Sequence, residues 1–383
     1  MRVEFAFHQC PCRTVTYHRG VNVGIVGGGI IGCATAWELS RNGVDVTVYD
    51  GRPVAGGATH ASAGVLAPYL GAHDPGPLQP LIVRSCGLFD AFVRRVRDDA
   101  GVAIEYSRCG SIEVALDETE ADSLSRFAAM HTAAGARWVD GDALRRLEPA
   151  IAGDPHGGVV IDEHGYVAAP ELTAALAVAA SVRGVSFIGE RVTSVNCESA
   201  QPAIRTVAGQ SSRFDRVIIA AGSWSSQLAP GTTVRAVYPV KGQLLRLKWP
   251  APKMERIVWT TRCYIVPRQG GHVLVGATMD DVGFDESVTE AATDQLLSAA
   301  HSVLQMPSGA GMVEARVGLR PATLDGLPIV GCSRTSDAVI FATGHFRNGI
   351  ALAPLTASLV TDLVLGRALD PALDPLSPKR FGL

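Results

Sequence analysis

A glycine-rich hexapeptide, residues 27–32 with the sequence GGGIIG, follows a short apolar run at residues 21–26. Residues 33–39 then have helical character, and residues 44–49 are rich in the β-branched side chains typical of a strand. The order of strand, glycine loop, helix and strand predicts a βαβ unit. Such a unit requires a parallel sheet, so at least part of the chain is expected to be an α/β domain.

The hexapeptide fits the pattern G-x-G-x-x-G, and an acidic residue, Asp50, closes the second strand roughly 20 residues further on. In this pattern Gly27 permits the tight turn, Gly29 lets the backbone approach a pyrophosphate, and Gly32 lets helix and strand pack closely. The helix N-terminus offers free N–H groups and a positive dipole end to the phosphates, and Asp50 can accept hydrogen bonds from a ribose. Together these parts predict a dinucleotide site.

Two later glycine turns favour FAD over NAD as the dinucleotide. Residues 216–225 (RVIIAAGSWS) form an apolar strand that runs into a glycine turn of small residues. Residues 344–350 (GHFRNGI) form a second glycine turn before the last predicted helix. The N-terminus of that helix would stabilise negative charge on a reduced flavin ring.

Composition excludes several other classes of protein. The 383 residues, 47% of them hydrophobic, suffice for two globular domains, and the net charge of −3 provides no basic surface for nucleic acid. No apolar run is long enough to span a membrane, and residues 1–20 lack the core of a signal peptide, so they read as a disordered tail or the product of an upstream start codon. Eight scattered cysteines suit a reducing cytoplasm, and the close pair Cys10 and Cys12 lacks zinc spacing, so no metal is expected.

Secondary-structure patterns extend this organisation along the chain. Residues 52–80 have no period and read as a long functional loop. Helices are predicted at residues 81–100, 118–135, 142–147, 170–182, 289–304 and 355–365. Strands are predicted at residues 112–116, 185–188, 192–197, 204–208, 216–221, 243–247, 257–259, 263–266, 273–276 and 339–341.

These elements predict a Rossmann-like FAD-binding domain with an inserted, mainly antiparallel β-sheet domain that binds the substrate. The FAD-binding domain is expected to comprise residues 21–85, 168–232 and 330–383. The substrate-binding domain is expected to comprise residues 86–167 and 233–329.

From about residue 21 to the C-terminus, the chain resembles the glycine oxidase and D-amino-acid oxidase family of flavoproteins. Besides GGGIIG, the resemblance is carried by ASAG (61–64), PVKG (239–242), CYIVPR (263–268), VGATM (275–279), GLRP (318–321) and GHFRNGI (344–350). The last four segments look like the glycine oxidase branch in particular.

The resemblance implies FAD that is bound without a covalent link, because residues 322–325 (ATLD) lack the cysteine that attaches flavin in some relatives. Together with the glycine turns, it predicts the following FAD contacts: Gly27, Gly29, Ile30, Ile31, Gly32, Asp50, Gly51, Ala58, Thr59, Ala63, Gly64, Val65, Val192, Ala221, Gly222, Trp224, Gly344, His345, Phe346, Arg347, Asn348, Gly349, Ile350 and Ala351. The imidazole of His345 is expected to have a mainly structural role, with the backbone there contacting the flavin.

The resemblance also implies the substrate contacts. Arg320 would pair with a substrate carboxylate, Tyr264 would assist by a hydrogen bond, Arg347 would lie at the substrate edge of the flavin, and Met279 would line the pocket. A planar guanidinium that makes two hydrogen bonds orients a carboxylate better than a lysine does. Arg320 and Tyr264 are therefore the predicted catalytic pair. Ordinary alternatives are strand packing for Tyr264 and the filling of a core gap for Met279.

The expected reaction is FAD-dependent removal of a hydride from the α-carbon of glycine or an N-substituted glycine. The imine would hydrolyse to glyoxylate and ammonia or an amine, and O2 would be reduced to H2O2. Orientation is the main requirement of such chemistry, and no dedicated base is essential. Relatives further imply a homo-oligomer, often a tetramer, and a role in thiamine biosynthesis or secondary metabolism. Alternatives are a D-amino-acid dehydrogenase with an acceptor other than O2, and a non-enzymatic FAD-binding protein.

Two positions depart from the glycine oxidase pattern. Val65 stands where Met is common, so the pocket is expected to be roomier, and Arg262 stands where His is common. On a strand, residues 262 and 264 would point to the same side, so Arg262 would face the substrate if Tyr264 does. A second guanidinium would favour a second carboxylate, as in an N-carboxymethyl amino acid. In the alternative interpretation, Arg262 extends to solvent at the strand end.

Overall fold

The computed structural model describes residues 20–71, 76–196, 201–228, 236–368 and 370–383. The expected tail, apart from its last residue, and the pair Cys10 and Cys12 therefore lie outside the described residues. Within the described ranges, no helix combines the length and the apolar character that crossing a bilayer requires.

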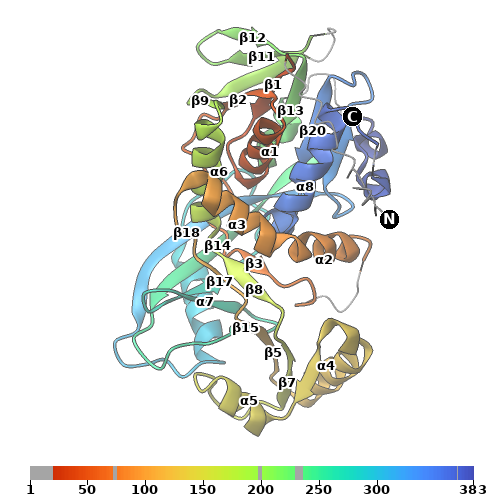
Figure 1. The fold of residues 1–383 in the computed structure, drawn as a ribbon. Helices are drawn as coiled ribbons and strands as arrows, with labels where there is room; N and C mark the ends of the chain where they lie inside the picture. The colour runs from red at the N-terminus through yellow and green to blue at the C-terminus, as the bar shows by residue number, and fades with distance from the viewer. Residues whose placement is uncertain (1–19, 72–75, 197–200, 229–235, 369) are drawn as a thin grey trace, which may run out of the picture.

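A six-stranded sheet forms the centre of the first lobe, which lies at the top of Figure 1. Strands β1 and β2 pair in parallel, β2 pairs in parallel with β9, and β1, β13 and β20 continue the parallel ladder, with β19 antiparallel at the edge. The strands are, in spatial order, β19 (Ile329–Cys332), β20 (Val339–Thr343), β13 (Arg216–Ile219), β1 (Asn22–Val26), β2 (Asp45–Tyr49) and β9 (Ser186–Ile188). The predicted βαβ unit with its parallel sheet is confirmed.

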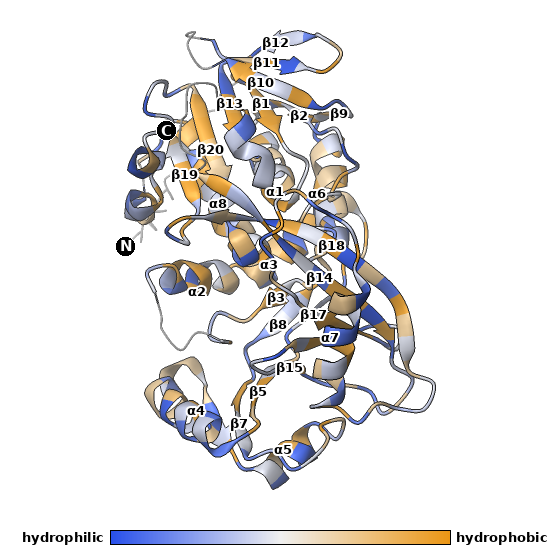
Figure 2. Ribbon diagram, turned by 180° about the vertical axis from the view of Figure 1, so that it is seen from behind, coloured by the Kyte–Doolittle hydropathy of each residue, from blue (hydrophilic) through white to orange (hydrophobic). Residues whose placement is uncertain are grey.

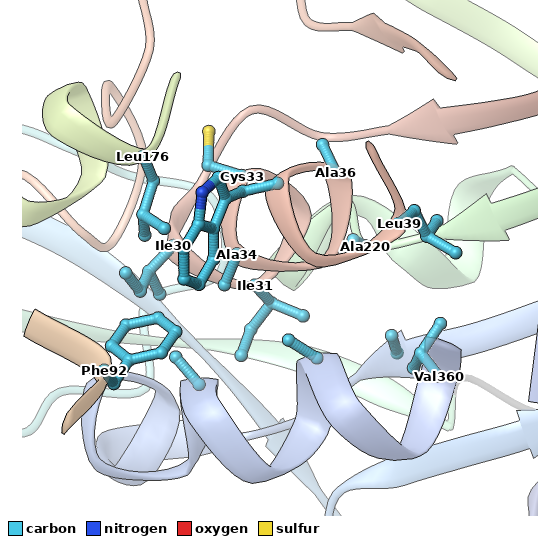
Figure 3. Packing of buried hydrophobic residues seen from close by; sticks show 14 of the residues in the cluster. Ile30, Ile31, Cys33, Ala34, Ala36, Leu39, Phe92, Leu176, Ala220 and Val360 are labelled. Carbon is cyan, nitrogen blue, oxygen red and sulfur yellow. The ribbon is translucent and has the colours of Figure 1, made fainter. Parts of the chain in front are cut away.

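Helix α1 (Ile30–Arg41) is the crossover of that unit and is buried on almost every side. It packs against α8 (Gly349–Val364) and α6 (Ala169–Val182), while Phe92 of α3 (Phe89–Ala100) meets its Trp37 edge to face with ring centres 5.3 Å apart. Figure 3 shows Ala34 and Ile31 of α1 facing α8, where small side chains let the two helices approach closely. This packing fixes the N-terminus of α1 relative to the sheet.

Asp99, near the end of α3, ties three helices of the first lobe together. Its carboxylate accepts hydrogen bonds from Trp37 Nε1 at 2.8 Å, Arg41 Nη1 at 2.8 Å and Arg183 Nη2 at 3.0 Å. Trp37 and Arg41 belong to α1, and Arg183 caps the C-terminus of α6. Such charge-assisted bonds are stronger than neutral ones, so Asp99 stabilises the packing of these helices.

The second lobe is built on an eight-stranded sheet in which neighbours are antiparallel except β5 and β15. Its order is β18 (Gly311–Thr323), β14 (Val237–Lys248), β17 (His272–Gly276), β16 (Tyr264–Arg268), β15 (Ile257–Trp259), β5 (Ser111–Ala115), β7 (Gly157–Ile161) and β6 (Arg137–Val139). This sheet confirms the predicted mainly antiparallel part of the fold. It carries α4 (Glu118–Met130), α5 (Gly141–Leu147) and α7 (Glu290–His301), seen in the lower half of Figure 1.

Smaller elements join and extend the two lobes. One small sheet consists of β3 (Val65–Leu66), β8 (Gly165–Val167) and β4 (Tyr106–Ser107), and another of β10 (Val192–Asn196), β11 (Ala203–Thr206) and β12 (Ser211–Arg213). The 3₁₀ helices η2 (Gly222–Gln227) and η3 (Phe346–Asn348) both contact β18. Hydrophobic residues colour β20, β13 and β1 in Figure 2, as expected for strands covered on both faces.

The two large sheets interleave along the chain in the way that the predicted domain division assumes. Strands of the first sheet fall within residues 22–49, 186–219 and 329–343, and those of the second within 111–161 and 237–323. Helix α3 packs in the core of the first lobe, although the predicted division assigns it to the substrate-binding domain. The division remains a prediction, and the packing of α3 favours a boundary after residue 100.

Several predicted elements differ from the structure. The helix predicted at residues 81–100 is two helices, α2 (Gln79–Gly87) and α3, separated at Leu88 next to Gly87. The helix predicted at 118–135 ends at Met130, and a 3₁₀ turn leads on to β6. The helix predicted to begin at residue 355 begins at Gly349, because Pro354 is accommodated inside α8 and the Leu355 N–H donates to Ser85 Oγ at 3.3 Å.

Candidate active site

A cavity of about 1130 Å³ is lined by residues from both lobes. Every residue predicted to contact FAD or substrate lines this cavity except Gly32 and Gly344. Gly32 instead packs against the loop behind it, where an added Cβ would lie 1.9 Å from Gly27 O. Gly344 has a φ of +74°, which L side chains rarely adopt, and it forms the turn out of β20.

The glycine loop has the geometry of a phosphate cradle. Gly27 has a φ of +117°, and a Cβ there would lie 2.3 Å from Ala220 O, so a glycine is required. Helix α1 starts after Gly29, which has no side chain to cap it, and its first turn holds no acidic residue; the Ile30 N–H donates to the uncharged Thr59 hydroxyl at 3.2 Å. Its positive dipole end is therefore left for a bound anion, and the residues present fit the pyrophosphate of FAD.

Asp50 is held rigidly at the end of β2. Its Oδ2 accepts a hydrogen bond from Gly28 N at 2.7 Å, and its Oδ1 accepts one from Arg52 N at 2.9 Å. Each carboxylate oxygen can accept a second hydrogen bond, so a ribose hydroxyl is still able to bind. The predicted role of Asp50 thus fits the geometry of its carboxylate.

The late glycine turn presents the N-terminus of α8 to the same cavity. This helix also has no side-chain cap and no acidic residue in its first turn. His345 is buried, its Nε2 lies 3.0 Å from Thr356 Oγ1, and burial lowers its pKa to about 3. The neutral ring is thus fixed within the fold, which agrees with the predicted structural role of His345.

Arg320 lies on β18, opposite Val240 of β14. Its Nη1 donates to Thr278 O at 3.0 Å and to Lys241 O at 3.3 Å, and it makes no ion pair with a carboxylate among the described residues. Burial is the main cause that lowers the pKa of its guanidinium. A half-buried cation that contacts no carboxylate loses hydration without gaining an ion pair, so this position favours a ligand that brings a carboxylate.

Two strand glycines make room for the predicted catalytic pair. A Cβ at Gly242 would lie 2.2 Å from both terminal nitrogens of Arg320, and a Cβ at Gly276 would lie 2.4 Å from the Tyr264 hydroxyl. Tyr264 stacks on Trp259 with ring centres 5.3 Å apart. Burial raises the pKa of Tyr264 and the charge of Arg320 opposes this, so the phenol is neutral and available as a donor near the guanidinium.

The remaining predicted substrate residues, including Val65, lie around the cavity. Arg347 on η3 is exposed, and Met279 is 70% exposed. Arg262 is exposed too and lies in the bend between β15 and β16. The assumption that Arg262 sits on a strand is therefore wrong, and alternation with Tyr264 does not apply, although Arg262 lines the same cavity.

The described wall of the cavity is strongly cationic. Its only acidic side chain among the described residues is Asp50. Its basic side chains are Arg52, Arg191, Arg262, Arg320 and Arg347. Such a wall favours anionic ligands, which suits both the phosphates of a dinucleotide and a carboxylate substrate.

Sequence reasoning missed four residues that shape this cavity: Gly242, Gly276, Trp259 and Arg52. A signal existed for the two glycines, since a glycine inside a strand often marks the close approach of another group. Trp259 and Arg52 carried no comparable signal, because nothing in their neighbourhood distinguishes them from packing and surface residues.

Comparisons with known proteins agree with this site. The family model described as FAD dependent oxidoreductase (DAO) matches residues 22–363. The glycine oxidase of Geobacillus kaustophilus is 33% identical over 94% of this chain and 97% of its own, and its crystal structure superposes with a TM-score of 0.87. The bifunctional protein ThiO/ThiG of Synechocystis is 32% identical over 93% of this chain, which spans 53% of that protein.

A further solved structure, iminodiacetate oxidase from Chelativorans sp. BNC1, is 27% identical and superposes with a TM-score of 0.85 over 93% of this chain and 98% of its own. The family match covers most of the sequence and includes both the glycine loop and Arg320. The chain therefore belongs to the DAO family of FAD-dependent oxidoreductases, as an amine oxidase that uses FAD.

Proposed function

We propose that this enzyme oxidises the α-carbon of glycine or an N-substituted glycine to an imine, which hydrolyses to glyoxylate and ammonia or an amine. One observation carries the proposal: the half-buried Arg320 guanidinium faces the FAD cavity and forms no ion pair with a carboxylate among the described residues. FAD, when bound, accepts the hydride and passes the electrons to O2 to give H2O2. The glycine oxidase relatives support the choice of substrate.

The residues of this chain contribute orientation. Arg320 is proposed to clamp the substrate carboxylate, and Tyr264 to donate a hydrogen bond to it. The carbonyls of Thr278 and Lys241 hold one edge of the guanidinium, which restricts its rotation before substrate arrives. A pre-oriented clamp of this kind lowers the entropic part of the barrier. We further propose that Arg347 and Met279 contact the substrate, and that the predicted FAD contacts other than Gly32 and Gly344 bind the cofactor in this cavity.

A second candidate substrate is an N-carboxymethyl amino acid, which carries two carboxylates. Arg262 and Arg347 are both exposed and line the cavity together with Arg320. A diacid would engage Arg320 with one carboxylate and one of the other two arginines with the second. The likeness to an iminodiacetate oxidase favours this candidate, since that protein is named for a substrate with two carboxylates.

Replacement of Arg320 by glutamine tests the main proposal. Bleaching of the flavin spectrum of the purified holoenzyme by glycine or an N-substituted glycine is followed without air, and kcat/KM for the same amines is measured under air from peroxide release. We expect kcat/KM to fall by about 100-fold or more while FAD content is retained, because the charge-assisted bonds to the carboxylate are lost. Arg213→Gln is the control, since Arg213 is exposed on β12, away from the cavity. Unchanged turnover in Arg320→Gln would end the proposal.

Substrate choice is tested separately by comparing glycine with N-carboxymethyl amino acids. If the second carboxylate binds Arg262, Arg262→Ala lowers kcat/KM for the diacid and leaves that for glycine unchanged. Faster turnover of glycine that is insensitive to Arg262→Ala would rule out the diacid. Peroxide release under air distinguishes an oxidase from a D-amino-acid dehydrogenase with another acceptor. We also propose that the enzyme is a cytoplasmic homo-oligomer. Its proposed pathway is thiamine biosynthesis or secondary metabolism.

A further inference from the structure

The loop that leaves β17 and leads to α7 is attached to both lobes. We call residues 280–287 of this loop the strap. Its first residue, Asp280, exchanges two backbone hydrogen bonds with Lys241 of β14, at 2.9 Å and 3.0 Å. Further along, the buried Lys241 Nζ donates to Asp285 Oδ2 at 2.7 Å and to Ser287 Oγ at 3.4 Å. These contacts anchor the strap to the second lobe at both of its ends.

The strap reaches the first lobe beside its second anchor, through Glu286, which lies between Asp285 and Ser287. Glu286 accepts two hydrogen bonds from Arg52, at 2.8 Å and 2.7 Å, in the parallel arrangement that guanidinium and carboxylate favour. The guanidinium of Arg52 lies 4.3 Å from the ring centre of Trp224, and Phe284 meets the same tryptophan at 5.5 Å. Three segments that are far apart in sequence therefore meet at Arg52, Trp224 and the strap.

This meeting point lies on the wall of the FAD cavity. Arg52 and Trp224 both line it, and the Arg52 N–H donates to Asp50, the residue assigned to the ribose. At the base of the strap, Thr278 O accepts a hydrogen bond from Arg320. The strap thus extends from the substrate arginine to the end of β2, where the dinucleotide loop also lies.

We propose that the strap retains the cofactor, with Glu286 as a positioning residue that acts through Arg52 and Trp224. The ion pair and the stacked rings fix these two side chains against the cavity wall, and FAD leaves only when this contact opens. Lys241 holds the strap independently through Asp285. Loss of the Arg52–Glu286 pair therefore lets the Arg52 and Trp224 side chains move in the cavity wall, while the strap itself stays attached. The proposal depends on FAD as the cofactor and not on the identity of the substrate.

The test measures FAD release directly. Holoenzyme is diluted until FAD dissociates, and the rise in flavin fluorescence gives the rate constant of release. We expect Glu286→Gln to release FAD about five-fold faster than the wild type, because a partly exposed bidentate pair over an aromatic ring contributes modestly. Asp281→Asn is the matched control, since Asp281 lies in the same strap, is exposed and makes no ion pair with another described residue. Its rate of release is expected to stay at the wild-type value.

A double-mutant cycle shows whether Glu286 acts through Arg52. If it does, Arg52→Gln also accelerates release, and Glu286→Gln adds nothing in that background. High salt should accelerate release from the wild type more than from Glu286→Gln, because salt screens the exposed pair. An unchanged rate of release in Glu286→Gln, or full additivity with Arg52→Gln, would overturn the proposal. Comparing the melting temperatures of the wild-type and Glu286→Gln apoproteins separates this effect from a loss of global stability, which would lower the melting temperature of the variant.

Discussion

Replacing Gly242 by alanine tests the position of the Arg320 guanidinium without altering the arginine. An added Cβ would lie 2.2 Å from both terminal nitrogens and 2.3 Å from Cζ, whereas ordinary contacts begin at 3.4 Å. The guanidinium must therefore move by about 1 Å, and its bonds to Thr278 O and Lys241 O must break or bend. A displacement of this size in an orienting group costs roughly 100-fold in rate. That factor corresponds to about 2.7 kcal/mol of transition-state stabilisation.

The assay is kcat/KM for glycine and an N-substituted glycine, from peroxide release, with FAD content measured on the same samples. We expect normal FAD content and a small change in melting temperature, because the displaced atoms are the end of a flexible side chain. Gly311→Ala is the control, since Gly311 lies on β18, the strand that carries Arg320, and a Cβ there would meet nothing within 4 Å. Wild-type kcat/KM in Gly242→Ala would refute the reasoning that Arg320, in the position seen here, holds the substrate.

Three further outcomes are expected. Asp50→Ala should weaken FAD binding, measured by fluorescence titration of the apoprotein, because it removes the ribose acceptor and leaves two backbone N–H groups unpaired. Asp99→Ala should lower the free energy of unfolding by about 2–4 kcal/mol in urea titrations with little change in kcat, since three donors lose their acceptor. Burial lowers the pKa of His345 and of His164 to about 3, below the value of about 6.5 in the unfolded chain. As the pH falls, these two imidazoles are therefore protonated in the unfolded chain before they are protonated in the folded protein. Stability should fall as the pH drops below about 6.5, by up to 1.4 kcal/mol per pH unit for each ring, and a flat profile in urea titrations would contradict this.

Local patterns in the sequence were enough to predict the βαβ unit of the first lobe. The strand, glycine loop, helix and acidic residue lie within 30 residues of one another, so their physical requirements are readable together. Strands β14 to β17 of the second lobe were also predicted as strands, because their apolar residues form runs that are long enough to indicate a sheet. The identity of the cofactor, FAD, was predicted from the later glycine turns and from the family resemblance.

What sequence reasoning missed depends on contacts between distant segments. Strand β18 was not predicted, because Glu314, Arg316 and Arg320 interrupt its apolar pattern and Pro321 argues against a strand. It forms because β14 pairs with it along its length. Arg262 was placed on a strand that in fact begins two residues later, and only the hairpin geometry shows this. The strap, likewise, has no local signature, since its partners are more than 40 residues away.

The FAD cavity draws its lining from both ends of the sequence, and the last contributing segment is residues 345–351. During synthesis these residues leave the ribosome long after the glycine loop at residues 27–32. The nascent protein must therefore keep the glycine loop and α1 without the cofactor until α8 packs beside them. Flavin loading is then expected to wait until α8 has emerged, and the supply of FAD in the expressing cell should govern how much of the newly made protein escapes degradation.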